Sequence, residues 1–353
     1  MTSTIESLLA RAPDAWNDAV ALGAIGRELH DRNRLDHARR FLERALELDP
    51  QQVECWAHLA YCGFRSFREQ EGLDVLRRGI EATGSIRLKG ALSHFLGEGQ
   101  ELEALKEEIA ASEDLGAQAS TLAHRFYAGE ADAALDGLRQ LMRSHPASRI
   151  PAEQFLWSVF GGAHRGLVDD EVIRREAVAV ADRWIRRAPA AVFAYWMKQQ
   201  LLAAQKDWEG VLDATVEGLA VFPDEETMMR MRGQALEQLG RDDEALQWYA
   251  RAVGAKPSFV GARVALGKLY EKMGKPELAE VVFREIPVAN PDYTIGRVSL
   301  ALFLGRQDRW EEAERIFLDA WAELPPFLRD AARRSPDAGD LLEREAIRAV
   351  VEA

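Results

Sequence analysis

The chain has 353 residues, 47% of them hydrophobic and 29% charged, a composition typical of folded proteins and not of disordered ones. Its net charge of −13 disfavours binding to nucleic acids, because an acidic surface repels phosphates. No apolar run approaches the roughly 20 residues that cross a bilayer, and the N-terminus lacks the pattern of a signal peptide. We therefore expect a cytoplasmic protein without membrane insertion.

Residues 19–86 hold two copies of a repeated pattern, after a capping segment at 1–18. Apolar and small residues return at the spacing of one helical face and then of a second, which predicts two helices in each copy. In the first copy these positions are Leu22, Ile25, Gly26, Leu29, Ala38, Leu42, Ala45 and Pro50.

The only cysteines, Cys55 and Cys62, fall in the second copy. Seven residues apart on one helix, they would lie about 10 Å apart, too far for a disulfide. Together with His58 they share one helical face, and such ligands suit zinc. Small residues pack at these positions, however, so we favour a core role and expect no metal.

The middle of the chain is less regular. Residues 87–114 lose the pattern and predict a short irregular hairpin. The pattern returns over 115–191 as two more copies, the second with nine additional residues around Gly161–Gly166. We expect this insertion to form a surface loop between the two helices.

Residues 192–325 hold four regular copies, which begin at Val192, Glu226, Val260 and Thr294, each 34 residues after the last. Position 32 of every one of these four copies is a proline. Because proline has no backbone N–H to donate, it ends the second helix of the copy. These prolines are Pro223, Pro257, Pro291 and Pro325. We expect residues 326–353 to form a helical C-terminal cap.

This pattern resembles the tetratricopeptide repeat family, in which Leu-Gly stands at positions 7 and 8, Ala at 20, Phe at 24 and Pro at 32. The clearest copy reads Met229, Arg232, Gly233, Leu236, Ala245, Tyr249, Ala252 and Pro257. The resemblance covers most of residues 19–325. It implies an all-α, right-handed α-α superhelical solenoid of about eight to nine helical hairpins with a C-terminal capping helix.

No constellation for catalysis, phosphate binding or metal binding stands out, so we expect no enzyme activity and no cofactor. The resemblance implies that the first helix of each repeat lines a groove for another protein or peptide, with positions 2, 5, 9, 12 and 13. The alternative is that aromatics such as Phe126 and Phe160 pack between hairpins. The groove residues are Arg27, His30, Tyr61, Phe64, Arg65, Tyr127, Trp157, Phe160, Trp196, Gln200, Arg230, Gln234, Lys268 and Lys272.

The leading hypothesis is a non-catalytic scaffold or adaptor that binds a polypeptide segment of a partner. The alternatives are a regulatory receptor for a small signalling peptide, or an accessory subunit that acts in trans on an enzyme or assembly machinery. The clamp that some relatives use for a C-terminal carboxylate is missing, since positions 5 and 9 are Gly23 and Arg27, then Ala57 and Tyr61.

Overall fold

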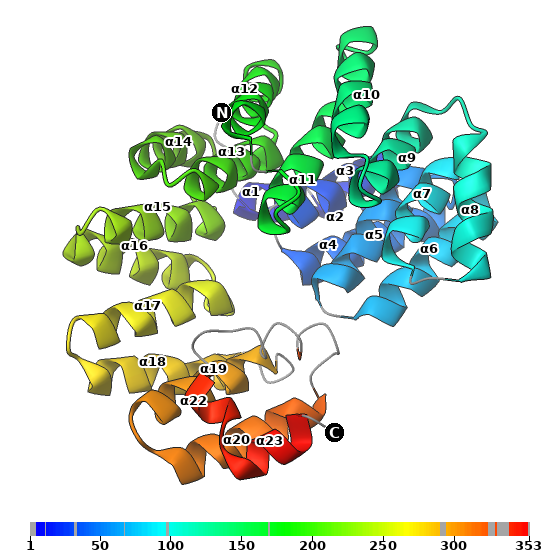
Figure 1. The fold of residues 1–353 in the computed structure, drawn as a ribbon. Helices are drawn as coiled ribbons and strands as arrows, with labels where there is room; N and C mark the ends of the chain where they lie inside the picture. The colour runs from blue at the N-terminus through cyan, green and yellow to red at the C-terminus, as the bar shows by residue number, and fades with distance from the viewer. Residues whose placement is uncertain are drawn as a thin grey trace. The chain divides into compact units, whose positions relative to one another are not determined.

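The computed structural model describes residues 5–10, 12–31, 34–66, 68–96, 99–168, 170–289, 294–323, 329 and 339–351. Every regular element in these ranges is an α-helix (Figure 1). The chain divides into two compact units, Met1–Asp224 and Glu225–Ala353. The division falls inside the regular run predicted for 192–325, so one of its hairpins belongs to the first unit.

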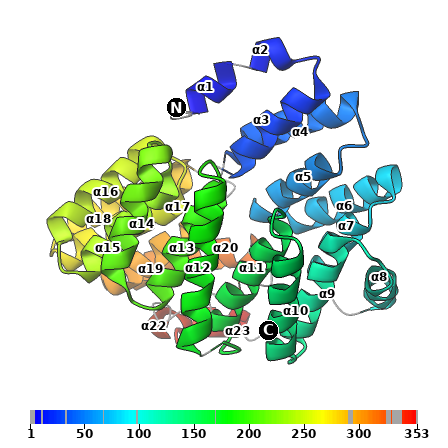
Figure 2. The same cartoon turned by 90° about the horizontal axis from the view of Figure 1, so that it is seen from above.

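The first unit begins with two short helices that pack on the third and are then followed by hairpins, each packed against the next (Figure 2). Its helices are α1 (Ile5–Ala10), α2 (Ala12–Ala15), α3 (Ala19–Asp31), α4 (Leu35–Leu48), α5 (Val53–Arg65), α6 (Glu69–Thr83), α7 (Ile86–Phe95), α8 (Gln100–Ala110), α9 (Leu115–Tyr127), α10 (Ala131–Ser144), α11 (Ile150–His164), α12 (Glu171–Arg187), α13 (Val192–Ala204) and α14 (Trp208–Val221).

The second unit continues the same hairpin plan and ends with two short helices that pack on α20. Its helices are α15 (Glu226–Gln238), α16 (Asp242–Ala255), α17 (Val260–Lys272), α18 (Pro276–Ala289), α19 (Ile295–Arg306), α20 (Trp310–Glu323), α22 (Gly339–Leu342) and α23 (Glu345–Val351).

Three hairpins, α3–α4, α15–α16 and α17–α18, close by fitting a large side chain of the second helix against a glycine of the first. A Cβ atom on Gly26 would lie 2.7 Å from Leu42, and one on Gly233 or Gly267 would lie 2.6 Å from Tyr249 or Phe283. Real Cβ contacts are never that short, so a side chain at these glycines would push the helices apart. The helices and their hairpin packing confirm the predicted all-α repeat fold, and this interlock holds the two helices of these hairpins close together.

In each of the four hairpins from α13 to α20, the turn between the helices places one residue in the left-handed region. Gly240 (φ 76°) and Gly274 (φ 70°) adopt it freely because they lack a Cβ atom. At the equivalent position of two other hairpins, Lys206 (φ 59°) and Asp308 (φ 57°) adopt it at a steric cost. The repeat therefore specifies the turn conformation more strictly than the turn residue.

The expected loop at Gly161–Gly166 is wrong in part, because Gly161 to His164 continue α11. The helix persists because Gly162 faces the ring of Phe126, and its missing side chain leaves that ring room to pack. Pro291 and Pro325 lie outside the described residues, as do residues 97 and 98 of the predicted irregular hairpin. Both cysteines are buried and free, so the prediction of no disulfide is confirmed.

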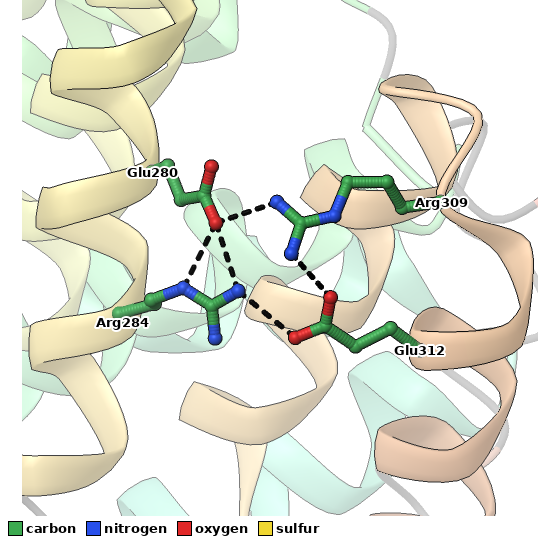
Figure 3. Close-up of polar contacts among 4 residues, drawn as sticks. All are labelled: Glu280, Arg284, Arg309 and Glu312. Carbon is green, nitrogen blue, oxygen red and sulfur yellow. Dashed lines mark hydrogen bonds and ion pairs between the residues drawn. The ribbon is translucent and has the colours of Figure 1, made fainter.

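An ion-pair network joins the second helices of two neighbouring hairpins, α18 and α20 (Figure 3). Arg284 contacts Glu280 at 2.8 Å and Glu312 at 2.9 Å, and Arg309 contacts Glu280 at 2.6 Å and also Glu312. Each charge thus has two partners of opposite sign. Such networks hold more firmly than single surface pairs, because fixing one member also fixes the others.

Among the described helices, none has both the length and the apolar character needed to cross a membrane.

Candidate functional site

The predicted groove residues all lie on first helices of hairpins, from α3 to α17. His30 is buried, whereas Trp157, Lys268 and Lys272 are exposed. The side chain of Arg65 lies outside the described set. The remaining residues are half-buried, namely Arg27, Tyr61, Phe64, Tyr127, Phe160, Trp196, Gln200, Arg230 and Gln234.

Four rings on α11 and α13 form an aromatic cluster, which consists of Trp157, Phe160, Phe193 and Trp196. The ring centroids of Trp157 lie 5.6 Å from those of both Phe193 and Trp196, and Phe160 lies 5.8 Å from Trp196. Each helix contributes two rings three residues apart, which places both on one helical face. Two neighbouring first helices therefore present one continuous aromatic surface.

Trp157 is the most open member of the aromatic cluster, with 40% of its surface exposed. Large rings that are held rigid and partly exposed lose little entropy when they bind, and Trp often carries much of the binding energy of an interface. Glu153 lies one helical turn before Trp157 and is half-buried. Burial raises the pKa of this carboxyl, while the charge of Arg149 opposes the rise. The cluster thus combines apolar anchors with a carboxylate at its edge.

Tyr61 and Phe64 of α5 belong instead to a packed group with Phe95 of α7. Phe64 stacks on Phe95 with centroids 3.8 Å apart, and Tyr61 lies 5.8 Å from the same ring. Burial raises the pKa of Tyr61 to about 12, so the phenol stays neutral. These two rings contribute to hairpin packing, as the alternative interpretation of the aromatics anticipates. Phe126 likewise lies fully in the core.

A histidine pair joins α3 and α5. The rings of His30 and His58 lie 4.9 Å apart, and Asp31 Oδ1 lies 3.3 Å from His30 Nδ1. Burial lowers the pKa of His58 to about 3, so its ring is neutral at physiological pH. Arg149, the N-cap residue of α11, lies 3.9 Å from Glu54 of α5. Charged and imidazole groups of three first helices therefore converge within the first unit.

The second unit carries the polar part of the predicted surface. Arg230 donates to Gln234 Oε1 at 3.1 Å, and burial lowers the pKa of the Arg230 guanidinium. Lys272 forms an ion pair with Asp242 at 2.7 Å. Both cations are therefore engaged within the unit, where Lys268 and Lys272 are exposed.

Sequence reasoning missed two members of this surface that the repeat register could have found. Phe193 stands at position 2 and Glu153 at position 5 of their blocks, both of which face the same side as Trp157. His58 and Phe95 carried no comparable signal, because neither position belongs to the groove pattern and the second lies in the irregular hairpin.

Comparison with known families matches models of the tetratricopeptide repeat to residues 19–52 and 194–258. These segments cover α3 with α4, and most of α13 to α16. The chain therefore contains tetratricopeptide repeats in these two segments.

Three curated proteins are similar to parts of the chain. A peroxisomal targeting signal receptor of Eremothecium gossypii is 24% identical over 251 residues, which cover 70% of this chain and 37% of that protein. Tetratricopeptide repeat protein 7B of Homo sapiens is 33% identical over 76 residues, 22% of this chain and 9% of that protein. Tetratricopeptide repeat protein 8 of Caenorhabditis elegans is 33% identical over 93 residues, 26% and 17% respectively.

The matches thus cover between 9% and 37% of the length of these relatives. Among solved structures, MamA aligns over 43% of this chain and 90% of its own, with a TM-score of 0.36 and 14% identity.

Proposed function

We propose that the protein is a non-catalytic scaffold or adaptor that binds a polypeptide segment of a partner on its first-helix face. The observation that carries the proposal is the aromatic cluster on α11 and α13, with Trp157 40% exposed. Membership of a repeat family whose members bind proteins supports it.

The chemistry of the cluster favours a protein partner over a nucleic acid. Rings can stack on bases, but single-stranded nucleic acids also need a basic track along the backbone. Here Glu153 borders the cluster, Arg149 is close to Glu54, and the chain carries a net charge of −13. An apolar side chain from a partner would instead bury the open face of Trp157 and gain free energy from its desolvation.

A second candidate is a receptor for a short peptide signal in the cytoplasm. The similarity to a peroxisomal targeting signal receptor over 70% of this chain favours it. Calorimetry separates the two candidates, because a peptide receptor binds short peptides as tightly as the full-length partner. A scaffold needs the larger surface and loses most of its affinity with a short peptide.

The proposal is tested by affinity capture from native cytosol, with purified wild-type protein and a Trp157→Ala/Trp196→Ala variant as baits. We expect recovery of specific partners to fall at least about ten-fold in the variant, since removed anchors of this type often cost 2 kcal/mol or more. Trp248→Ala is the matched control, because Trp248 is a half-buried ring on the second helix α16.

Circular dichroism of all three proteins establishes that they are folded. Retention of every partner by the double variant would contradict the proposed surface, as would equal loss with Trp248→Ala.

A further inference from the structure

Two histidines and an aspartate from neighbouring hairpins meet where α3 packs against α5. His30 and Asp31 are the last two residues of α3, and His58 lies in the middle of α5. One ligand atom of each lies within 4.8 Å of the others. We propose that this histidine site, composed of His30, Asp31 and His58, binds a divalent transition-metal ion, zinc in the first instance, and thereby links the first two hairpins.

The donor set selects the class of metal. Imidazole nitrogen with carboxylate oxygen suits Zn²⁺ and its neighbours in the first transition row, whereas Mg²⁺ and Ca²⁺ prefer oxygen ligands alone. Bonds of about 2.0–2.2 Å in a tetrahedral site place ligand atoms roughly 3.4 Å apart. Ligand atoms that lie within 4.8 Å of one another therefore need to approach by roughly 1.4 Å at most, a distance on the scale of side-chain rotamer adjustment.

His58 provides an independent observation that points to a ligand. Its Nδ1 atom is buried and has no hydrogen-bond partner within the described part of the protein. A buried polar atom without a partner is destabilising, and a metal ion would satisfy it.

Asp31 supplies the negative charge that a cation needs. Burial raises the pKa of this carboxyl, but the hydrogen bond with His30 and the charges around it hold the pKa below its usual value. Asp31 is exposed, and it therefore offers a route from solvent to the site. A two-histidine, one-carboxylate set also leaves a position open to water or to a side chain of a partner.

Nearby charges limit the affinity. Arg27 and Arg149 act on His58, and Arg149 also acts on Asp31. The charge of Arg149 is offset in part by Glu54 at 3.9 Å and by Glu153. We therefore expect a dissociation constant on the order of micromolar, weaker than that of a closed four-ligand structural site.

The cysteines form the competing site on the same helix. Burial raises the pKa of the Cys55 thiol, and its Sγ donates to Gln52 Oε1 at 3.2 Å. A protonated thiol with a partner is a poor ligand, because metals bind the thiolate. The geometry thus favours the histidine site over the set of Cys55, His58 and Cys62 that shares a face in sequence.

The test is a Zn²⁺ titration of the tag-free full chain after treatment with a chelator, followed by calorimetry and by competition with a chromophoric chelator. We expect one zinc ion per chain and at least ten-fold weaker binding in Asp31→Asn and in His58→Ala. His37→Ala is the matched control, since His37 is exposed on α4 and should leave binding unchanged. Cys55→Ser/Cys62→Ser should also bind zinc as the wild type does.

Asp31→Asn decides the question if His58→Ala does not fold, because it removes a charge from an exposed side chain and leaves the packing intact. Unchanged zinc binding in Asp31→Asn would overturn the proposal, as would loss of binding in the cysteine variant. Absence of wild-type binding at 100 μM zinc, about a hundred times the micromolar constant expected for such a site, would overturn it too. Cobalt substitution gives a further readout, where a thiolate charge-transfer band would contradict a site of nitrogen and oxygen ligands.

Discussion

The hairpins α13–α14 and α15–α16 follow one another in the chain, yet they fill the same interlock in opposite ways. In α15–α16 the first helix carries Gly233 and the second carries Tyr249, whose ring occupies the space that the glycine leaves. In α13–α14 the corresponding residues are Gln199 and Thr215, so the large side chain stands on the first helix and the small one on the second. All four are buried.

The comparison teaches that the repeat conserves the combined volume at the interlock and not the residue at either position. It also shows a difference in polarity. Gln199 Nε2 reaches the carbonyl of Ala214 only at 3.5 Å, and its Oε1 atom is buried without a hydrogen-bond partner in the described structure. Tyr249 by contrast donates to Glu237 at 2.8 Å. The interlock of α15–α16 is therefore filled by a polar side chain that has a hydrogen-bond partner, whereas that of α13–α14 buries an amide oxygen without one among the described residues.

The largest effect on stability should come from placing the residue types found at the interlock of α13–α14 into α15–α16. Tyr249→Thr should lower the free energy of unfolding by about 3 kcal/mol because it leaves a cavity, and Gly233→Gln by about 1–3 kcal/mol because it overpacks. The double variant should recover at least about 1 kcal/mol of the sum, as measured by urea unfolding. Strict additivity would refute the idea of a volume exchange.

Gln199→Leu tests the polarity difference. The two side chains have similar size, and the substitution removes the buried oxygen that lacks a partner while it gives up only a long hydrogen bond. We expect stabilisation of about 1 kcal/mol in urea unfolding. Gln200→Leu, on the same helix but half-buried, is the control and should have a smaller effect. Destabilisation by Gln199→Leu would show that the amide is better satisfied than its contacts suggest.

The turns of the two hairpins give a smaller contrast. Lys206 adopts φ 59° where Gly240 adopts φ 76°. Lys206→Gly should stabilise the first hairpin by about 0.5–1 kcal/mol, and Gly240→Ala should destabilise the second by about 1 kcal/mol. Thermal melts of the two variants should therefore shift in opposite directions. Shifts in the same direction would mean that the turn conformation is not what distinguishes these residues.

The smallest expected effect is a loss of stability at low pH, and it involves the ion-pair network of the second unit. Hydrogen bonds from Arg309 and Arg284 hold the pKa of Glu280 below its usual value, and those from Arg284 and Arg309 do the same for Glu312. A lowered folded-state pKa stabilises above the unfolded value, and this contribution is lost as pH falls through the folded one.

Urea unfolding should thus show that the free energy of unfolding of the second unit falls between pH 7 and about pH 3. In the Glu280→Gln/Glu312→Gln variant, this free energy should depend less steeply on pH. Parallel curves for the wild type and the variant would contradict this role of the network.

Much of the fold was accessible from sequence because the repeat encodes it locally. Periodicity identifies both helices of a hairpin, and a glycine at position 8 with a large residue at position 24 implies their close approach, as Gly26 and Leu42 illustrate. The first-helix face followed from the same register. Where that register is interrupted, as at Gly161–Gly166, local reasoning put a loop in place of the last turn of α11.

The sequence by itself determined the hairpins, their 34-residue phase and the helix that each candidate side chain occupies, because these depend on contacts within one repeat. Only the tertiary structure decided which of those side chains meet. Trp157 with Trp196, and His30 with His58, come from different hairpins, and their distances depend on how neighbouring repeats stack. That geometry results from the packing of every side chain between the helices, which no single repeat contains.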